Sequence, residues 1–381
     1  MMRHPPGRPT WLEIDLSAIV HNFQVVQRTV GPDCAIYPAI KANGYGLGAV
    51  PIARTLARAG ARGFCVAMTE EAIPLRAAGI DQPIVLLSGF IPGLEQQVVA
   101  LDLEPVIFDL EAAHRLSRLR GPQDPPLIVH VKIDTGMGRI GFDAEQLHPV
   151  MTELDRLPGI RVHSLLSHFA WADEAAGQTA TRNQLQRFHQ AHASLGVRGA
   201  ALQLSCANSA GLLAYPEARL SWVRPGIMLY GASPFHPYRT AQMDGLRPVV
   251  RWITHVLSIR QVPSGTPLGY GHEYVTQRPS RIALLPVGYA DGYPRILKGH
   301  AQILTHGQRA PVVGRISMDL TLVDVTDIPQ AVTGSRVTLL GADGDGFIGI
   351  EEMADWSATI PYEVICRFGM RVPRHHLPEI P

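Results

Sequence analysis

The chain has 381 residues, of which 46% are hydrophobic and 18% charged. It is long enough to bury a sizeable core and to form two domains. The formal net charge of +1 comes from interspersed positive and negative residues, without the basic block that nucleic acids or anionic membranes select. We therefore expect no nucleic-acid partner and no membrane association.

The amino terminus does not read as a signal peptide. Residues 1–15 contain Pro and Arg where a signal peptide needs a continuous apolar core, and no later segment is apolar for long enough to span a bilayer. We expect a cytoplasmic protein. The four cysteines lie far apart without paired spacing, which argues against a disulfide framework and against a zinc site.

Helix-like and strand-like segments alternate over the first 240 residues. Apolar residues at helical spacing predict helices over 16–31, 49–60, 109–120 and 181–196. Eight apolar runs have the length of strands. They are 35–40, 63–67, 83–88, 104–108, 127–133, 160–168, 201–205 and 222–231. This alternation predicts an α/β protein with a closed (β/α)8 barrel of the TIM type and active groups at the carboxyl ends of its strands. An open doubly wound sheet is the main alternative.

The pattern changes near residue 241. Short apolar runs at 251–262, 281–292, 309–325 and 335–341 are broken by Pro and Gly, which is typical of a small β domain. We assign 1–240 to the barrel domain and 241–381 to a smaller, mostly β domain. The first ten or so residues are able to associate with the second domain.

Lys41 ends the first apolar run and is followed at once by small and turn-forming residues. A lone lysine at a strand end is usually a surface group. At the carboxyl end of the first barrel strand, however, it would point towards the active mouth, where a lysine amine can form a Schiff base.

The loops after the seventh and eighth predicted strands suit a phosphate, which often binds at this place in such barrels. Ser209 offers a hydroxyl, and Gly226 permits close approach to its own N–H and that of Ile227. Alone, each loop is an ordinary turn. Together with Lys41 they suit pyridoxal phosphate, which needs an amine for its aldehyde and an anchor for its phosphate.

A set of motifs across both predicted domains resembles bacterial alanine racemase. They include "WLEIDLSAIVHN", "AIKANGYGLG", "VHVKIDTGMGRIGF", "LLSHFA", "CANSAG", "VRPGIMLYG", "PLGYGHEY", "PVGYADGYPR", "GRISMDL", "IPYEVICR" and "RVPR". The resemblance covers nearly the whole chain after residue ten. It implies a homodimer that interconverts L- and D-alanine by a two-base mechanism, through an external aldimine of pyridoxal phosphate, and supplies D-alanine for peptidoglycan.

The resemblance also implies roles for individual residues. Lys41 forms the internal aldimine and is one base, while Tyr270, contributed by the partner's β domain, is the other. Arg224 faces the pyridine nitrogen and is linked to His168, which helps Tyr270. A guanidinium can only donate, so the ring nitrogen should stay unprotonated, which disfavours transamination. The remaining cofactor contacts fall on Tyr45, Asn208, Ser209, Gly226, Ile227 and Tyr362.

Other positions match groups around the substrate. Arg139 and the N–H of Met318 match groups that bind its carboxylate, and Lys132 matches a lysine that carries a carbamate in many members. A charged entrance passage is implied at Asp173, Tyr289, Arg295, Arg315, Asp319 and Ile360. Cys206 and Leu268 occupy variable positions, which leaves the strictness of alanine specificity open.

Two alternative functions also remain open. The chain could be another barrel-type pyridoxal phosphate enzyme, such as a broader-specificity racemase or a decarboxylase, or a non-catalytic cofactor-binding protein.

The acidic run 341–352 resembles the second half of a calcium-binding loop. Its first ligand position is Gly341, however, and a strand precedes it where that motif needs a helix, so we expect no metal.

Overall fold

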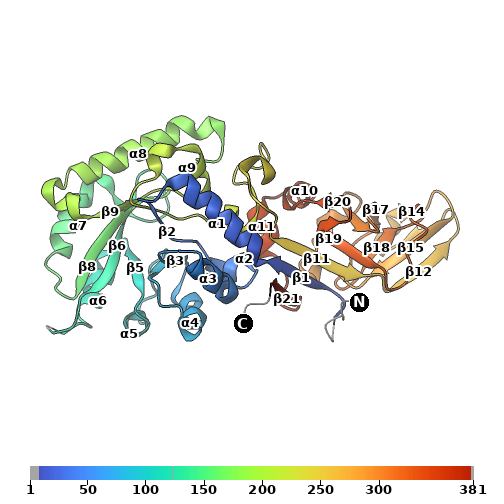
Figure 1. Cartoon of the computed structure of the whole chain (residues 1–381), viewed down its shortest axis with the longest axis horizontal. Coiled ribbons are helices and arrows are strands. Elements are labelled where there is room, and N and C mark those ends of the chain that lie inside the picture. The colour runs from blue at the N-terminus through green and yellow to red at the C-terminus, as the bar shows by residue number, and fades with distance from the viewer. Residues whose placement is uncertain (1–7, 122, 379–381) are drawn as a thin grey trace. The chain divides into compact units, whose positions relative to one another are not determined.

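The computed structural model describes residues 8–121 and 123–378, and the chain divides into two compact units (Figure 1). One unit is Val20–Leu229; the other combines the segment up to Ile19 with the chain from Tyr230 onwards. Of the first ten residues, which we expected to be able to join the β domain, 1–7 lie outside the described residues. Thr10 lies on that domain, where its hydroxyl is 2.8 Å from the hydroxyl of Thr254.

The Val20–Leu229 unit is a parallel barrel. Strands β3, β4, β5, β6, β8 and β9 pair in that order, and β10 pairs with β2. A bridge between Ala39 and Cys65 joins the β2 segment to β3. The Arg224 N–H donates to the Ala207 carbonyl (3.0 Å) and joins β10 to β9. Within the described residues this closes a ring of eight strands and confirms the predicted barrel over an open sheet.

The strands of the barrel are β2 (Ala35–Ile36), β3 (Phe64–Val66), β4 (Ile84–Leu86), β5 (Glu104–Ile107), β6 (Leu127–Asp134), β8 (Ile160–Leu166), β9 (Gln203–Ser205) and β10 (Trp222–Val223). A short strand, β7 (Phe142–Asp143), pairs with the end of β6.

Helices lie along the outside of these strands (Figure 1). They are α1 (Leu16–Val30), α3 (Ala49–Arg58), α4 (Thr69–Ala77), α5 (Glu95–Ala100), α6 (Leu110–Ser117), α7 (Leu147–Leu154), α8 (Gln178–Ala193) and α9 (Ser209–Ala214). In α3 the fully buried Ile52, Ala53 and Leu56 share one face, as the helical spacing of the sequence predicts. The helices expected over 16–31, 49–60, 109–120 and 181–196 are confirmed.

The second unit is a mostly antiparallel sheet with the order β12-β15-β18-β17-β16-β19-β11-β1-β21, and β20 pairs with β19. Its strands are β1 (Trp11–Asp15), β11 (Val250–His255), β12 (Ser258–Val262), β15 (Ser280–Leu285), β16 (Gln302–Thr305), β17 (Gln308–Val313), β18 (Thr321–Asp324), β19 (Arg336–Asp343), β20 (Gly346–Ile348) and β21 (Arg374–Leu377). Strand β1 joins this sheet because Trp11 pairs opposite Ile253. The predicted small β domain is confirmed.

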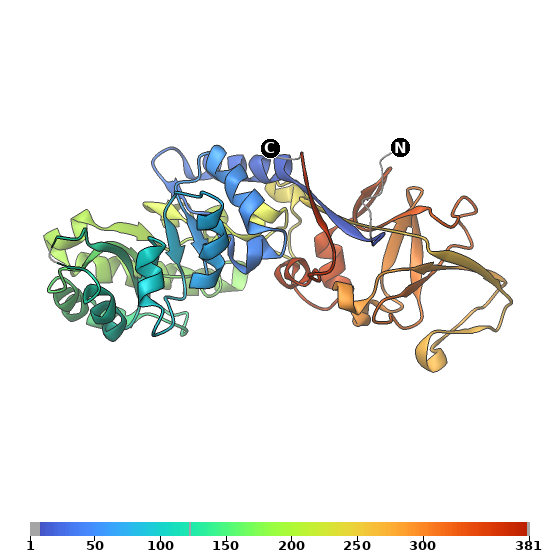
Figure 2. The ribbon, with the colours of Figure 1, turned by 90° about the horizontal axis from the view of Figure 1, so that it is seen from below.

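The described part of this unit also contains two α-helices and a hairpin that lies outside the main sheet. Helices α10 (Ile350–Trp356) and α11 (Pro361–Cys366) pack on each other. Figure 2 shows the hairpin of β13 (Pro267–Leu268) and β14 (Tyr274–Val275), with the 3-10 turn η7 (Tyr270–His272) at its tip, extending away from the sheet. In the core, the ring of Trp252 meets Tyr293 and Phe368 edge-on, at 5.6 and 5.1 Å between centroids.

Candidate active site

Lys41 stands at the start of a strained turn that follows the first barrel strand. The strand segment is held beside β3 because the Ile40 N–H donates to the Cys65 carbonyl (2.9 Å). Residues 42–45 then all have left-handed backbone angles, with φ between 52° and 64°. Three of the four are not glycine, and each such residue costs about 1–2 kcal/mol. A strained turn persists only where its surroundings fix it, so the backbone that carries Lys41 is held in one conformation.

Lys132 is a buried lysine inside the barrel, on β6, with only 7% of its surface exposed. Burial, and then the nearby charges of Arg224 and Arg139, hold the pKa of Lys132 well below its ordinary value. Within the described residues its side chain makes no hydrogen bond and no ion pair. The Lys132 amine thus gives up its proton more readily than an ordinary lysine, because it is buried near two guanidinium groups.

His168 belongs to the same cationic cluster. Burial is the main reason that its pKa lies well below the ordinary histidine value, and the positive charges of Lys132 and Arg224 lower it further. His168 is therefore neutral at pH 7.

The loop that leads to Arg139 is shaped by Asp134, whose Oδ1 accepts from the N–H groups of Gly136 and Met137 (both 2.8 Å).

Arg224 follows β10 and is 5% exposed. Its guanidinium donates to the hydroxyl of Ser205, to the carbonyl of Ser167 (2.6 Å) and to that of Cys206 (3.2 Å), and it lies 5.4 Å from the ring centre of Trp222. The link that we expected between His168 and Arg224 is thus not a hydrogen bond in the described part of the chain. The positive charge of Arg224 instead acts on His168 by lowering the pKa of its imidazole.

Tyr45, Ser209 and Gly226 meet at the predicted phosphate corner. The Gly226 N–H donates to the Ser209 hydroxyl (2.9 Å), and a Cβ at position 226 would lie 2.4 Å from the hydroxyl oxygen of Tyr45. Only glycine leaves room for this approach. The neighbouring residues lie at helix starts: Asn208 caps α9 by accepting from the Gly211 N–H (2.9 Å), and Ile227 begins the 3-10 helix η5 (Ile227–Tyr230).

Cys206 lies beside this corner and is fully buried. Burial raises the pKa of its thiol to about 12, so the group is a neutral neighbour of Arg224.

Of the predicted site residues not described so far, Asp173 is exposed on the barrel unit and the others lie on the β unit. Four of them are between 44% and 67% exposed: Tyr270, Tyr289, Met318 and Ile360. Asp319 is also exposed, and Tyr362 is partly buried on α11.

The turn that carries Tyr270 is held by Glu273, which pairs with Lys298 (2.5 Å) and with Arg315. The hydrogen bond from Arg315, and then that from Lys298, hold the pKa of Glu273 at about 2. No role was assigned to Glu273 from the sequence.

Met318 and Asp319 are held by an ion-pair network centred on the buried Asp291. Arg371 Nε donates to Asp291 Oδ1 (2.7 Å), and Arg371 Nη2 donates to Asp319 Oδ1 (2.6 Å). The Ala290 N–H donates to the Met318 carbonyl (3.0 Å). Asp291 lies in the motif "PVGYADGYPR" and Arg371 in "RVPR". The sequence assigned no role to either residue, and only their contacts in the folded chain show that they hold Met318 and Asp319.

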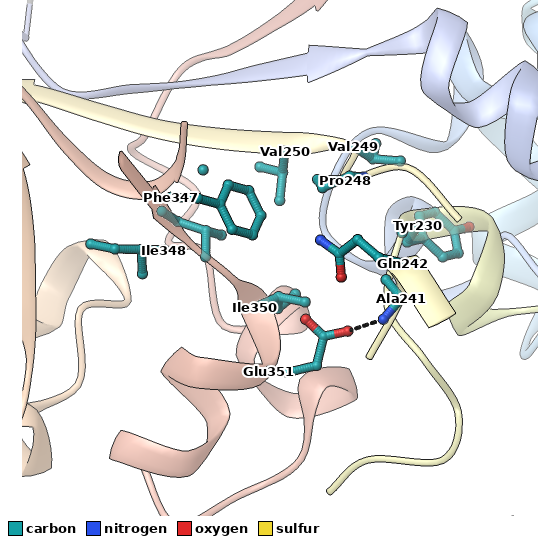
Figure 3. A pocket seen from close by; sticks show the side chains of 13 residues that line it. Tyr230, Ala241, Gln242, Pro248, Val249, Val250, Phe347, Ile348, Ile350 and Glu351 are labelled. Atoms are coloured by element: carbon teal, nitrogen blue, oxygen red, sulfur yellow. Dashed lines mark hydrogen bonds between the residues drawn. The ribbon is translucent and has the colours of Figure 1, made fainter. Parts of the chain in front are cut away.

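A small cavity lies elsewhere in the β unit (Figure 3). It is lined by side chains that include Val250, Phe347, Ile350 and Glu351, and its volume is about 10 Å³. A space of this size has room for no more than about one water molecule. Glu351 Oε1 accepts from the Ala241 N–H (3.0 Å), so this carboxylate holds the chain near Ala241 in place.

Two negative findings concern the described residues alone. They contain no helix that is both long and apolar enough to cross a membrane. They also contain no group of three or more His, Cys, Asp or Glu side chains that could hold a metal ion. The acidic run at 341–352 includes the β19–β20 hairpin, in which Asp343 Oδ2 accepts from the Gly307 N–H (3.0 Å).

The fold and the site together define an enzyme with a barrel domain followed by a β domain. In its barrel, cationic side chains lie near the corner formed by Tyr45, Ser209 and Gly226. Two family models cover the chain: the alanine racemase N-terminal domain matches residues 14–234, and the alanine racemase C-terminal domain matches residues 249–376. The chain belongs to the alanine racemase family.

Individual relatives agree with this assignment. The chain is 43% identical to an alanine racemase of Syntrophobacter fumaroxidans over 94% of this chain and 95% of that protein. The structure resembles the alanine racemase from E. faecalis with a TM-score of 0.91 at 33% identity, over 97% and 98% of the two chains. It also resembles the alanine racemase from Bartonella henselae with covalently bound pyridoxal phosphate, with a TM-score of 0.87 at 32% identity, over 97% and 100%.

Proposed function

We propose that this chain interconverts L- and D-alanine with pyridoxal phosphate as its cofactor, and that in a bacterial cytoplasm the D-alanine serves peptidoglycan synthesis. One observation carries the proposal beyond family membership. Lys41 stands at the end of the first barrel strand on a fixed turn, and the last strand of the same barrel ends in a buried arginine beside a glycine-dependent corner. In one barrel these residues would supply a covalent anchor for the cofactor, a hydrogen-bond donor and a place for its phosphate.

The residues present fit the cofactor. Tyr45, Ser209 and Gly226 form a corner that a Cβ at position 226 would fill, which suits a compact anionic group. The Ser209 hydroxyl accepts from Gly226, so its own O–H remains to donate to a phosphate oxygen. Asn208, Ile227 and Tyr362 complete the proposed set, and Lys41 would hold the aldehyde carbon.

Pyridoxal phosphate, when bound, supplies an electron sink that acidifies the α-C–H bond of an amino acid. Arg224 limits that sink, because a guanidinium has no acceptor atom and cannot give up its proton at neutral pH. The pyridine nitrogen beside it would stay unprotonated. The hydrogen bonds to Ser205 and Ser167 and the contact with Trp222 keep Arg224 in place for this role.

Racemisation needs one base on each face of the α-carbon. We assign Lys41 to one face and Tyr270 to the other. Arg139 and the Met318 N–H bind the substrate carboxylate, and Tyr289 and Asp319 border the entrance. The lowered pKa of Lys132 favours the unprotonated amine, which is the form that adds to carbon dioxide: the nitrogen bonds to the carbon, one C–O π bond breaks, the nitrogen releases a proton to solvent, and the carbamate anion would be paired by Arg139 and Arg224.

The proposed site needs two copies of the chain. Lys41, Arg139, His168 and Arg224 lie on the barrel unit, whereas Tyr270 and Met318 lie on the β unit. We infer that a homodimer combines the barrel of one subunit with the β unit of its partner, and that its two-fold symmetry builds the same site twice.

The function is tested on the purified full chain loaded with pyridoxal phosphate. Starting from L-alanine or D-alanine, chiral chromatography should show each converging on an equal mixture. Borohydride reduction followed by peptide mapping should find the cofactor on Lys41. Racemisation of larger amino acids without racemisation of alanine would contradict the substrate, and a label on another lysine would contradict the site.

A further inference from the structure

Glu71 joins the turn after Lys41 to the neighbouring strand. Its Oε1 accepts from the Ala42 N–H (2.8 Å), and its Oε2 accepts from the Ala67 N–H (2.7 Å). Ala42 directly follows the lysine, and Ala67 directly follows β3. One carboxylate thus uses both of its oxygens to hold two strand ends at the barrel mouth.

We propose that Glu71 is a positioning residue for Lys41. The Ala42 nitrogen belongs to the peptide group that joins Lys41 to Ala42, so its hydrogen bond fixes the plane of that peptide and with it the backbone that orients the lysine side chain. This inference rests on the proposed function, because it takes Lys41 as the residue that holds the cofactor.

The rest of the turn has its own support. The Gly44 N–H donates to the Ile40 carbonyl (2.8 Å), and the Gly46 N–H donates to the Ala42 carbonyl (2.7 Å). Asn43 Oδ1 accepts from the Ala49 N–H at the start of α3 (2.9 Å). None of these bonds restrains the Ala42 N–H, so loss of Glu71 should loosen the Lys41–Ala42 peptide and leave the later part of the turn in place.

The chemistry of the contact requires a carboxylate. Both partners of Glu71 are donors, and an ionised carboxylate is an acceptor at both oxygens. Glu71 lies in the first turn of α4, where the helix dipole also favours a negative charge. Glutamine would keep one acceptor and turn an NH2 group towards the other N–H. Glutamine is therefore a variant of nearly the same shape that breaks one of the two contacts and removes the negative charge from the other, so the hydrogen bond to Ala42 is lost or weakened whichever way the amide turns.

The chain supplies a matched control. Glu70 precedes Glu71 in the same helical turn and is exposed, and it makes no ion pair or side-chain hydrogen bond in the described part of the chain. Glu70→Gln removes the same charge from the same place on the helix without touching the lysine turn. Any effect of Glu71→Gln that Glu70→Gln lacks is due to the two hydrogen bonds.

The experiment compares these two variants as full chains, with wild type. Hydrogen–deuterium exchange of the Ala42 amide should be about tenfold faster in Glu71→Gln, and its dissociation constant for pyridoxal phosphate should rise about tenfold, as expected for loss of one charge-assisted hydrogen bond. The turnover number should fall with little change in KM, because the carboxylate-binding groups are elsewhere. Glu70→Gln should match wild type in all three.

Two results would overturn the inference. One is an unchanged exchange rate at Ala42; the other is faster exchange with unchanged cofactor affinity and turnover. If Glu71→Gln does not fold, Glu71→Asp, which keeps the charge but is shorter by one methylene, is measured in the same way with the same expected directions. A wild-type chain that does not carry the cofactor on Lys41 or does not racemise alanine refutes the proposed function itself, which separates the two failures.

Discussion

Replacement of Asp291 by asparagine should destabilise the β unit and weaken alanine binding. Asp291 is fully buried and accepts from Arg8 (2.7 Å), from Arg371 Nε (2.7 Å) and Nη2 (3.1 Å), and from the Gly288 N–H (2.9 Å). Asparagine has the same shape but keeps only one oxygen and has no charge. Both arginines would then lose their buried partner.

The size of the effect follows from the exposure of the partners. Removing one member of a buried ion pair typically costs about 3–5 kcal/mol. The side chains of Arg8 and Arg371 are 27% and 37% exposed, so water can solvate part of the charge that is left. We therefore expect a loss of about 2–3 kcal/mol. For a unit of this size that corresponds to a melting temperature lower by about 5–10 °C.

The assay is thermal unfolding followed by circular dichroism, with steady-state kinetics on the same samples. Because Arg371 also holds Asp319 beside Met318, KM for both alanine enantiomers should rise more than the turnover number falls. Asp327→Asn is the control, since Asp327 also pairs with an arginine, Arg278 (2.5 Å), but its side chain is 75% exposed. That variant should melt as wild type does. If Asp291→Asn melted within a degree of wild type, the buried network would not be what holds this turn.

Three further outcomes are expected. Gly226→Ala should weaken cofactor binding strongly and lower the melting temperature, because its Cβ would lie 2.4 Å from the Tyr45 hydroxyl. Adding Tyr45→Phe should restore that melting temperature but not the affinity for pyridoxal phosphate. Unchanged affinity in Gly226→Ala would count against the phosphate corner. Burial and nearby cations keep His168 neutral in the folded chain, whereas an unfolded imidazole binds a proton below about pH 6.5. The cofactor-free wild type should therefore lose stability as the pH falls through that value, and His168→Gln should lose less. Parallel plots of melting temperature against pH for the two proteins would contradict this. Refolding Lys41→Ala together with Tyr270→Phe should restore about a quarter of wild-type activity, because half the dimers are hybrids with one intact site each; no recovery in confirmed hybrids would place both bases on one chain.

The architecture was largely predictable because it depends on patterns that are local in the sequence. Apolar runs such as 127–133 and 160–168 are long enough to identify as strands without knowing their partners. The helix over 49–60 likewise shows its buried face in its own spacing. Lys41 was identifiable because it ends the first predicted barrel strand, where a side chain would point towards the active mouth.

Other features were not predictable because they depend on contacts between distant segments. The left-handed backbone after Lys41 includes Ala42 and Tyr45, and neither residue type signals such a conformation. Glu71 reads as an ordinary acidic residue at a helix start, and its contact with Ala42 spans 29 positions. Asp291 and Arg371 lie 80 positions apart, so their ion pair needs the folded sheet to bring them together.

The most direct test of the account is exchange of the alanine α-proton with solvent deuterium. Wild type and Tyr270→Phe, each loaded with pyridoxal phosphate, are incubated in deuterium oxide with L-alanine or D-alanine, and deuterium at the α-carbon is followed by NMR. Wild type should exchange both enantiomers. Tyr270→Phe should lose exchange from one enantiomer far more than from the other, because Lys41 still serves the opposite face. Equal loss from both, or no exchange of alanine by wild type, would contradict a two-base alanine racemase.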